Sequence, residues 1–349
     1  MPQYAILVQP SANRVYSQHA ARLTRNELLA LDGLLLDGRL AAAGEPEERT
    51  MGGVPYLVLP TPALTADDLA VLANLSSLFA LFELNDDGTL RPLELARLDR
   101  YDDDLLTILK YIGKTNEQLT RLLLNLTAAA ALPVQDFLHS RVRVLDPVCG
   151  RGTTLNQALM YGWDAYGVDT DRRDVEAYTA FADRWLQDKR LKHRSRSTRV
   201  RVAGKNLGRR TTFELAPTKE LYRAGDVQTL EITQGDTLDA DRMYRAGSFD
   251  LVVADAPYGI QHGSVTGPRT PSRSPQALLT DAIPVWAGLL RRGGAMGLSW
   301  NTKVLPRADL LAMLTDAGLE PLDDAPLLDL AHRVDHAIER DLVVARKPG

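Results

Sequence analysis

The chain has 349 residues, of which 45% are hydrophobic and 25% charged, and its formal net charge is −4. This composition is typical of a globular protein with room for two domains, and it excludes a globally disordered chain and a uniformly basic nucleic-acid binder. The single cysteine, Cys149, excludes a disulfide framework and a cysteine-based zinc site. His332 and His336 have no further ligands beside them in the sequence, so no metal site is expected.

The N-terminal residues 1–14 lack the positive leader and apolar run of a signal peptide. No stretch approaches the roughly 20 uninterrupted apolar residues that a membrane span needs. We therefore expect a cytoplasmic protein with no membrane partner.

The first hundred residues mix short strands and helices without a catalytic cluster or a repeat of fixed period. Apolar patterning predicts strands at 4–10 and 55–60, a helix at 24–36, and a segment at 65–84 that begins as a helix and ends as a strand. Thr24 and Glu27 have the spacing of a capping box at the start of the predicted helix. Residues 1–100 are thus expected to form a smaller α+β region, with substrate binding as its role.

Strands and helices alternate in the rest of the chain, after an amphipathic segment at 104–132 that is broken near Gly113. The predicted strands lie at 141–148, 164–169, 230–235, 249–255, 295–300 and 338–347, and the predicted helices at 153–162, 275–292 and 307–317. This alternation argues for a parallel sheet with crossover helices. Residues 101–349 are therefore expected to form a second, α/β domain.

A basic insertion over about 189–228 interrupts this alternation. Residues 189–210 contain ten Lys or Arg residues and no Asp or Glu. Such a run predicts either a surface that binds a polyanion through its phosphates or a solvated basic hairpin.

The segment LDPVCGRGTT, at 145–154, joins the first strand of the alternation to its helix. Gly150 and Gly152 permit a tight turn, and the helix N-terminus behind them offers unpaired N–H groups to a ligand. The loop does not match the dinucleotide fingerprint, because Leu155 stands where that fingerprint needs Gly or Ala. A turn that uses glycine for its geometry alone remains an alternative.

Acidic residues follow three of the predicted parallel strands: Asp146, Asp169 and Asp236. Because the carboxyl ends of parallel strands meet at the edge where ligands bind, we expect these side chains to converge. Asp169 lies about 20 residues after the glycines, where an acid accepts hydrogen bonds from ribose hydroxyls. Asp236 is expected near an adenine amino group or its hydrogen-bonded surroundings. For each of the three acids taken singly, a helix cap or a turn is the alternative role.

A fourth acid ends the apolar strand at 249–255. The strand is followed by a turn that contains Asp255, Ala256, Pro257 and Tyr258, within the segment VVADAPYGI. A turn of this kind either ends a strand with a solvated acid and a packing tyrosine, or presents a carboxylate and an aromatic ring to a ligand.

Taken in order, DPVCGRGTT, GVD, GDT and DAPYG resemble the motifs of the Rossmann-like S-adenosylmethionine-dependent amino-methyltransferases, whose catalytic turn is (D/N)PPY. The chain is most similar to the RNA methylase group that contains the tRNA guanine-N2 methyltransferases, in which DPPYG is typical. The resemblance covers about 104–347. It implies a Rossmann-like class I methyltransferase sheet, mostly parallel with an antiparallel C-terminal strand, and S-adenosyl-L-methionine as the cofactor.

The resemblance also implies two sets of site residues. Those implied to bind the cofactor are Asp146, Val148, Gly150, Gly152, Thr153, Asp169 and Asp236, with Lys114 and Thr115 from the segment 110–127, which would cover its methionine end. Asp255 and the Ala256 carbonyl would accept hydrogen bonds from an exocyclic amine, Pro257 would fix the turn, and Tyr258 would stack on the base. Ala256 replaces the first proline of the family motif, at a position where the chemistry uses the backbone carbonyl.

The expected activity is methyl transfer to an exocyclic amine of a nucleic-acid base, with guanine N2 in tRNA as the favoured target. A DNA adenine or cytosine amino-methyltransferase is one alternative, because those enzymes share the catalytic turn. The lack of an obvious target-recognition domain favours RNA over DNA. A catalytically silent, cofactor-binding RNA-binding protein is the other alternative, which Ala256 keeps open.

Overall fold

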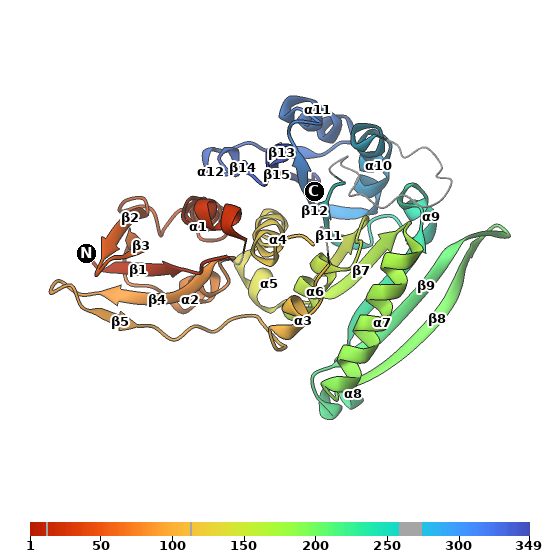
Figure 1. Ribbon diagram of the computed structural model, residues 1–349, viewed down its shortest axis with the longest axis horizontal. Coiled ribbons are helices and arrows are strands. Elements are labelled where there is room, and N and C mark those ends of the chain that lie inside the picture. The colour runs from red at the N-terminus through yellow and green to blue at the C-terminus, as the bar shows by residue number, and fades with distance from the viewer. Residues whose placement is uncertain (12, 112–113, 258–273) are drawn as a thin grey trace.

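The computed structural model describes residues 1–11, 13–111, 114–257 and 274–349. Its strands form two sheets, one within residues 3–92 and one within residues 143–346. The two sheets follow one another along the long axis of the molecule (Figure 1). Helix α1 packs against α4 and α12 and so joins the two parts.

The first sheet is antiparallel and has the order β2-β3-β1-β4-β5. Its strands are β1 (Gln3–Val8), β2 (Glu47–Met51), β3 (Val54–Pro60), β4 (Leu78–Leu84) and β5 (Leu90–Pro92), and its helices are α1 (Arg14–Leu35) and α2 (Ala66–Ala73). The central strand β1 is the most deeply buried, with Ala5 and Ile6 wholly inaccessible. An α+β arrangement in this region agrees with the pattern of the sequence.

Helix α1 begins ten residues before the predicted start, so the capping box predicted at Thr24 is wrong. Asn13 is the actual N-cap. Thr24 lies inside the helix, where its hydroxyl donates to the Ala20 carbonyl at 2.7 Å. Glu27 is buried and accepts hydrogen bonds from the backbone N–H and the hydroxyl of Ser76. Burial raises the pKa of Glu27 to about 7.

The second sheet has the order β13-β15-β12-β11-β6-β7-β10-β9-β8, with β14 paired to β15. Its strands are β6 (Arg143–Asp146), β7 (Asp164–Asp169), β8 (Lys192–Val202), β9 (Lys205–Ala216), β10 (Gln228–Gly235), β11 (Phe249–Asp255), β12 (Leu290–Asn301), β13 (Glu320–Leu322), β14 (His332–Arg333) and β15 (Glu339–Arg346). Strands β10, β7, β6, β11 and β12 run parallel, and β15 runs antiparallel to β12. This is the predicted class I methyltransferase sheet, and the fold prediction is confirmed.

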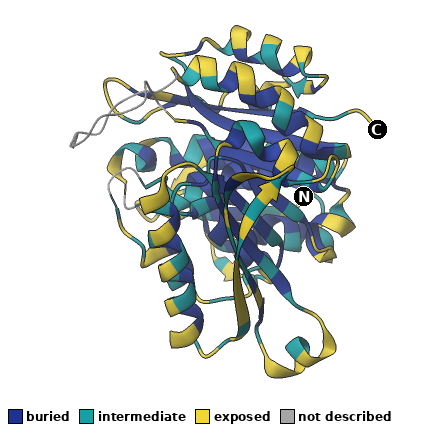
Figure 2. Ribbon diagram, turned by 90° about the vertical axis from the view of Figure 1, so that its right-hand side faces the viewer, coloured by how far each residue is buried: buried dark blue, intermediate teal, exposed yellow. Residues whose placement is uncertain are grey.

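Helices cover both faces of this sheet. They are α3 (Asp104–Thr107), α4 (Glu117–Ala131), α5 (Val134–His139), α6 (Thr153–Met160), α7 (Arg172–Asp188), α8 (Lys219–Ala224), η1 (Thr237–Asp239), α9 (Ala240–Met243), α10 (Pro275–Leu289), α11 (Arg307–Asp316) and α12 (Ala325–Leu328). Leu251 and Val253 of β11 pack into the core that includes α4, α6 and α7, whereas Val252 and Ala254 pack into the core that includes α10 and α11. Burial on both faces explains why the parallel strands read as continuous apolar runs, and Figure 2 shows the buried residues along them.

The basic insertion forms two further strands of the second sheet. Strand β9 pairs antiparallel with β10, and β8 pairs antiparallel with β9. The two strands form a long hairpin at the edge of the sheet (Figure 1). Among the residues that the structure describes, no helix combines the length and the apolar character needed to cross a bilayer.

Candidate active site

The glycine loop between β6 and α6 places its two glycines in different surroundings. Both have positive φ, 48° for Gly150 and 77° for Gly152, a conformation that glycine adopts without strain. A Cβ on Gly152 would lie 2.3 Å from the ring of Tyr178, so this glycine is needed for packing against α7. A Cβ on Gly150 would meet no atom within 4 Å. The space beside Gly150 is therefore available to a ligand.

Two acids of the strand ends lie at this loop. Asp169, the last residue of β7, accepts a hydrogen bond from the Gly150 N–H at 2.8 Å. Asp146, the last residue of β6, accepts one from the Val148 N–H at 3.1 Å. Asp146 is only 3% exposed. Burial, together with the nearby charges of Asp169 and Asp255, raises the pKa of Asp146 to about 7.

Burial also raises the pKa of Asp169. A buried carboxylate with few compensating charges favours the binding of a cation, which would stabilise its ionised form. The edge formed by the ends of β6 and β7 is therefore suited to a positively charged ligand that also carries hydrogen-bond donors.

Asp236 and Thr153 each begin a helix at the same edge of the sheet. The exposed Asp236 side chain caps η1 by accepting a hydrogen bond from the Leu238 N–H at 3.0 Å. Thr153 is the first residue of α6, and its hydroxyl lies 3.2 Å from the phenol oxygen of Tyr111. The guanidinium of Arg151 lies over the Tyr111 ring, 4.9 Å from its centroid.

The segment before α4 connects the glycine loop with the turn after β11. Tyr111 contacts the loop through Thr153, and four residues later the Thr115 hydroxyl donates to Asp255 Oδ2 at 2.5 Å. Lys114 points elsewhere: its ammonium group donates to the Leu106 carbonyl at 2.6 Å and forms an ion pair with Glu117. The sequence assigned Thr115 to the cofactor, whereas the structure places its hydroxyl on Asp255.

The turn after β11 is held by the neighbouring strand β12. The Ala256 N–H donates to the Ser299 carbonyl at 2.8 Å, which continues the β11–β12 pairing one residue beyond Asp255. Proline has no N–H, so the proline of the family motif would be unable to make this bond. Ala256 is buried and Pro257 is exposed. Tyr258 lies outside the described residues.

Arg340 is a residue of the site that no sequence motif marked. It is buried on β15, and its Nη2 atom lies 3.8 Å from Asp255 Oδ2. The Asp255 side chain is 20% exposed, so one part of it remains accessible beside Thr115 and Arg340. Only the register of β15 against β12, in which Arg340 pairs with Asn301, brings this arginine to the active-site edge.

A cavity of about 500 Å³ lies next to this segment, between the first sheet and α4. Its lining includes Ser11, Asn13, Arg97, Lys114, Thr115 and Arg121. The cavity therefore adjoins Thr115, whose hydroxyl binds Asp255, and it does so on the side of the N-terminal region. Across the described part of the chain, no group of three or more His, Cys, Asp or Glu residues is arranged to hold a metal ion.

Searches against protein-family models and against curated proteins return no match. Among solved structures, the chain is similar to TrmN from Thermus thermophilus, at 14% identity over 99% of this chain and 100% of that chain, with a TM-score of 0.43. It is also similar to magnesium protoporphyrin IX methyltransferase from Synechocystis PCC 6803 with bound SAM, at 15% identity over 68% of this chain and 86% of that chain, with a TM-score of 0.37. A third is a TehB-like SAM-dependent methyltransferase from Corynebacterium glutamicum, at 17% identity over 61% of this chain and 84% of that chain, with a TM-score of 0.33. The fold assignment itself rests on the strand order and directions described above.

Proposed function

We propose that the protein is a methyltransferase that uses S-adenosyl-L-methionine to methylate an exocyclic amine of a nucleic-acid base, with guanine N2 in tRNA as the target. One observation carries the proposal. The segment from Tyr111 to Thr115 contacts both the glycine loop, through Thr153, and the carboxylate of Asp255. A cofactor loop and a candidate catalytic acid therefore belong to one site.

The residues at the ends of β6 and β7 fit this cofactor. The open space at Gly150 admits a ligand close to the backbone, and the buried acids Asp146 and Asp169 favour a ligand that is cationic and carries hydroxyl groups. In the proposal these residues hold the cofactor together with Val148, Gly152, Thr153 and Asp236. Lys114 and Thr115 belong to the segment that covers it.

When bound, S-adenosyl-L-methionine supplies an electrophilic methyl group on a sulfonium. Asp255, which Thr115 and Arg340 hold in place, accepts a hydrogen bond from the amine of the base. The Ala256 carbonyl accepts the second hydrogen bond, and both direct the nitrogen lone pair toward the methyl group. Most of the rate enhancement then comes from positioning and electrostatics. The Asp255 carboxylate is also placed to take the proton that the amine loses.

We propose residues 1–100 and 101–349 as two domains, of which the first contributes to substrate binding. The cavity beside Thr115 supports this role, because its lining combines residues of both parts. In this proposal Pro257 fixes the catalytic turn and Tyr258 stacks on the target base. The partner is tRNA, so the protein would act in the cytoplasm, with no membrane or metal required.

The test is methyl transfer from a tritiated cofactor onto bulk tRNA and onto DNA, followed by mass spectrometry of the nucleosides. We expect label in tRNA as N2-methylguanosine. Label on DNA alone would replace the proposal with the DNA amino-methyltransferase alternative. Cofactor binding by calorimetry without label on either polymer would indicate the catalytically silent RNA-binding protein.

A further inference from the structure

The β8–β9 hairpin extends past the edge of the sheet at which the candidate active site lies. Gly235, the last residue of β10, pairs with Gly208 of β9, and the neighbouring Gln234 pairs with Asp169 at the end of β7. The hairpin therefore continues beyond the carboxyl ends of the parallel strands before it turns at Ala203. At ~3.3 Å per residue, its end lies roughly 15 Å past that edge. Figure 1 shows the end of the hairpin projecting beyond α9.

Exposed basic side chains are concentrated on this hairpin. Residues 189–216 contain ten Lys or Arg residues and one acid, Glu214, in a chain whose formal net charge is −4. Within the described residues, two of these cations form ion pairs with carboxylates: Lys189 and Arg210. The others are exposed and form none with any described residue: Arg190, Lys192, Arg194, Arg196, Arg199, Arg201, Lys205 and Arg209.

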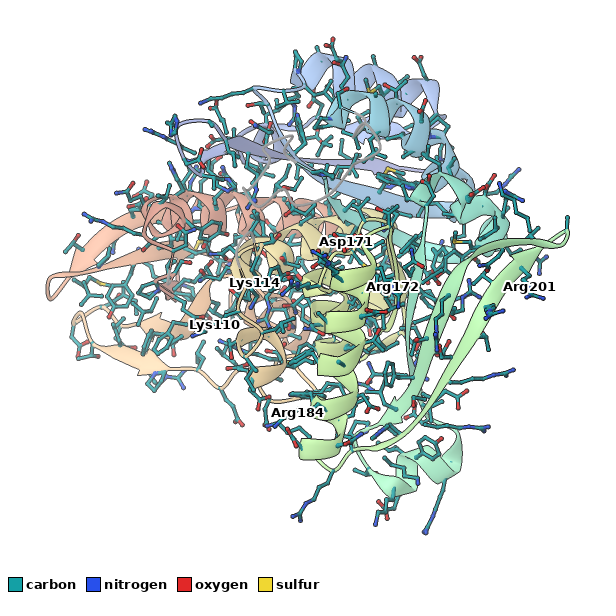
Figure 3. All side chains as sticks on the ribbon, turned by 45° about the vertical axis from the view of Figure 1, so that its right-hand side comes forward. Lys110, Lys114, Asp171, Arg172, Arg184 and Arg201 are labelled. Carbon is teal, nitrogen blue, oxygen red and sulfur yellow. The ribbon has the colours of Figure 1, made fainter. Side chains whose placement is uncertain are left out.

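Helix α7 runs beside the hairpin and also exposes charged side chains to solvent, so the ion pairing of the two surfaces can be compared. Two of the three exposed cations of α7, Arg172 and Arg184, form ion pairs with acids four residues later, and Arg173 forms none with a described residue. The hairpin instead places Arg199 directly opposite Arg209. Like charges at directly opposite positions destabilise a strand pair. Figure 3 shows Arg172 and Arg184 on α7 and Arg201 near the far end of the hairpin.

The space between the hairpin and α7 is a groove of about 640 Å³. The hairpin side of its lining carries mainly hydroxyl and guanidinium groups: Ser195, Ser197, Thr211, Arg196 and Arg209. Helix α7 contributes Thr179 and two acids, Asp183 and Glu176, and Glu176 is paired with Arg172. The Thr179 hydroxyl is buried and has no hydrogen-bond partner among the described residues. Hydroxyl and guanidinium donors are the groups that proteins use to contact phosphate and sugar oxygens.

We propose that the β8–β9 hairpin binds the sugar–phosphate backbone of the RNA substrate and guides it toward Asp255. Uncompensated cations on a projecting ribbon complement a polyanion, and contacts to phosphates supply affinity without reading sequence. The identity of the polyanion as substrate rests on the proposed function. RNA binding itself is measurable whether or not methyl transfer takes place.

The test compares two triple variants of the full chain with equal loss of charge. One is Arg199→Gln, Arg201→Gln and Lys205→Gln, near the end of the hairpin. The matched control is Arg223→Gln, Arg245→Gln and Arg292→Gln, whose exposed side chains lie near the amino ends of the parallel strands, at the opposite edge of the sheet. Both variants are checked for an unchanged circular dichroism spectrum and for cofactor affinity by calorimetry.

We expect the hairpin variant to bind tRNA on the order of tenfold more weakly near physiological salt, with the control within about twofold of wild type. We also expect a change in the slope of log K for tRNA association against log salt concentration. Each lost phosphate contact reduces the magnitude of this slope by about 0.7 to 0.9, so the hairpin variant should lose about two. Cofactor affinity stays unchanged in both variants.

Equal weakening in both variants, an unchanged salt slope, or wild-type protein that does not bind tRNA would each overturn the hairpin proposal. Equal or tighter hairpin-dependent binding to DNA would overturn its assignment to RNA, and hairpin-dependent capture of an acidic protein in place of RNA would do the same. Hairpin-dependent tRNA binding without methyl transfer would overturn the proposed function only. Methyl transfer with an unaltered KM for tRNA in the hairpin variant would overturn the hairpin role only.

Discussion

Two neighbouring parallel strands, β6 and β11, both end in an aspartate, and the two aspartates have different surroundings. Asp146 is 3% exposed and bonds to the N–H of Val148 in its own loop. Asp255 has a side chain that is 20% exposed and bonds to Thr115, which lies 140 residues away in the sequence. The same residue type at equivalent ends of strands therefore serves two roles, one inside the protein and one at a surface.

The backbone explains the difference. After β6 the chain turns at once into the glycine loop, and Asp146 is enclosed beneath that loop. After β11 the backbone stays paired with β12 through the Ala256 N–H. The Asp255 side chain is thereby left at the edge of the sheet, within reach of another segment. These surroundings agree with the proposed function, in which Asp146 belongs to the cofactor site and Asp255 contacts the substrate.

The largest expected effect is that of Asp255→Ala on catalysis. We expect kcat for methyl transfer to fall about 10³-fold, because the amine loses the carboxylate that accepts its hydrogen bond and takes its proton. Cofactor affinity, measured by calorimetry, should stay within a few-fold of wild type. Asp255→Asn is the matched control: it keeps a hydrogen-bond acceptor and should retain part of the activity. Loss of cofactor affinity along with activity would mean that Asp255 maintains the structure of the site and does not act on the substrate alone.

The two glycines of the loop should separate ligand binding from packing. Gly152→Ala is expected to lower stability by roughly 3 kcal/mol, since the new Cβ collides with Tyr178 at a positive φ. Gly150→Ala should cost only about 1 kcal/mol of strain and weaken cofactor binding at least about tenfold. Thermal denaturation and calorimetry on both variants measure the two effects. The opposite pattern would place the ligand away from Gly150.

Asp146→Asn should change how stability depends on pH. The folded pKa of Asp146 is about 7, above the ~3.9 of an unfolded aspartate, so ionisation opposes folding. Its effect is absent below pH ~4, grows as the pH rises toward 7, and is complete above 7. We therefore expect the variant to unfold at higher urea at pH 8, by a difference on the order of 4 kcal/mol, and to match wild type at pH 4. Equal stability of the two proteins at pH 8 would contradict the raised pKa of Asp146.

The smallest expected effect is that of Ala256→Pro. The substitution removes the N–H donor to the Ser299 carbonyl, at an expected cost of about 1 kcal/mol in urea unfolding. Activity should remain within a few-fold of wild type, because the Ala256 carbonyl is retained. An increase in stability would mean that the entropy proline removes from the unfolded chain outweighs the lost bond.

The parts of the fold that local patterns specify could be predicted from the sequence. Strands β7 and β11 have the predicted bounds, because the apolar or small residues at 165–168 and 251–254 are each followed at once by an aspartate. The predicted start of α1 was ten residues late, because the buried face of its first turns consists of only Tyr16, Ala20 and Leu23 among polar residues. For 189–210 the sequence offered a basic hairpin only as one of two alternatives, without strand bounds, because the Arg and Ser residues of β8 mark no buried face.

The candidate site was predictable only where motifs carry it. Glycines and strand-end acids have a recognisable order in the sequence, so motifs mark both Gly150 and Asp169, which the structure joins by a hydrogen bond. The bond between Thr115 and Asp255 and the approach of Arg340 depend on tertiary pairing between distant segments. No local spacing encodes such contacts.

A structure of the protein bound to S-adenosylhomocysteine would locate the cofactor site by direct observation. We expect the ligand to lie across the carboxyl ends of β6 and β7, against Gly150, with Asp255 at the end that would carry the methyl group. A ligand bound elsewhere, for instance in the cavity between the first sheet and α4, would contradict this expectation.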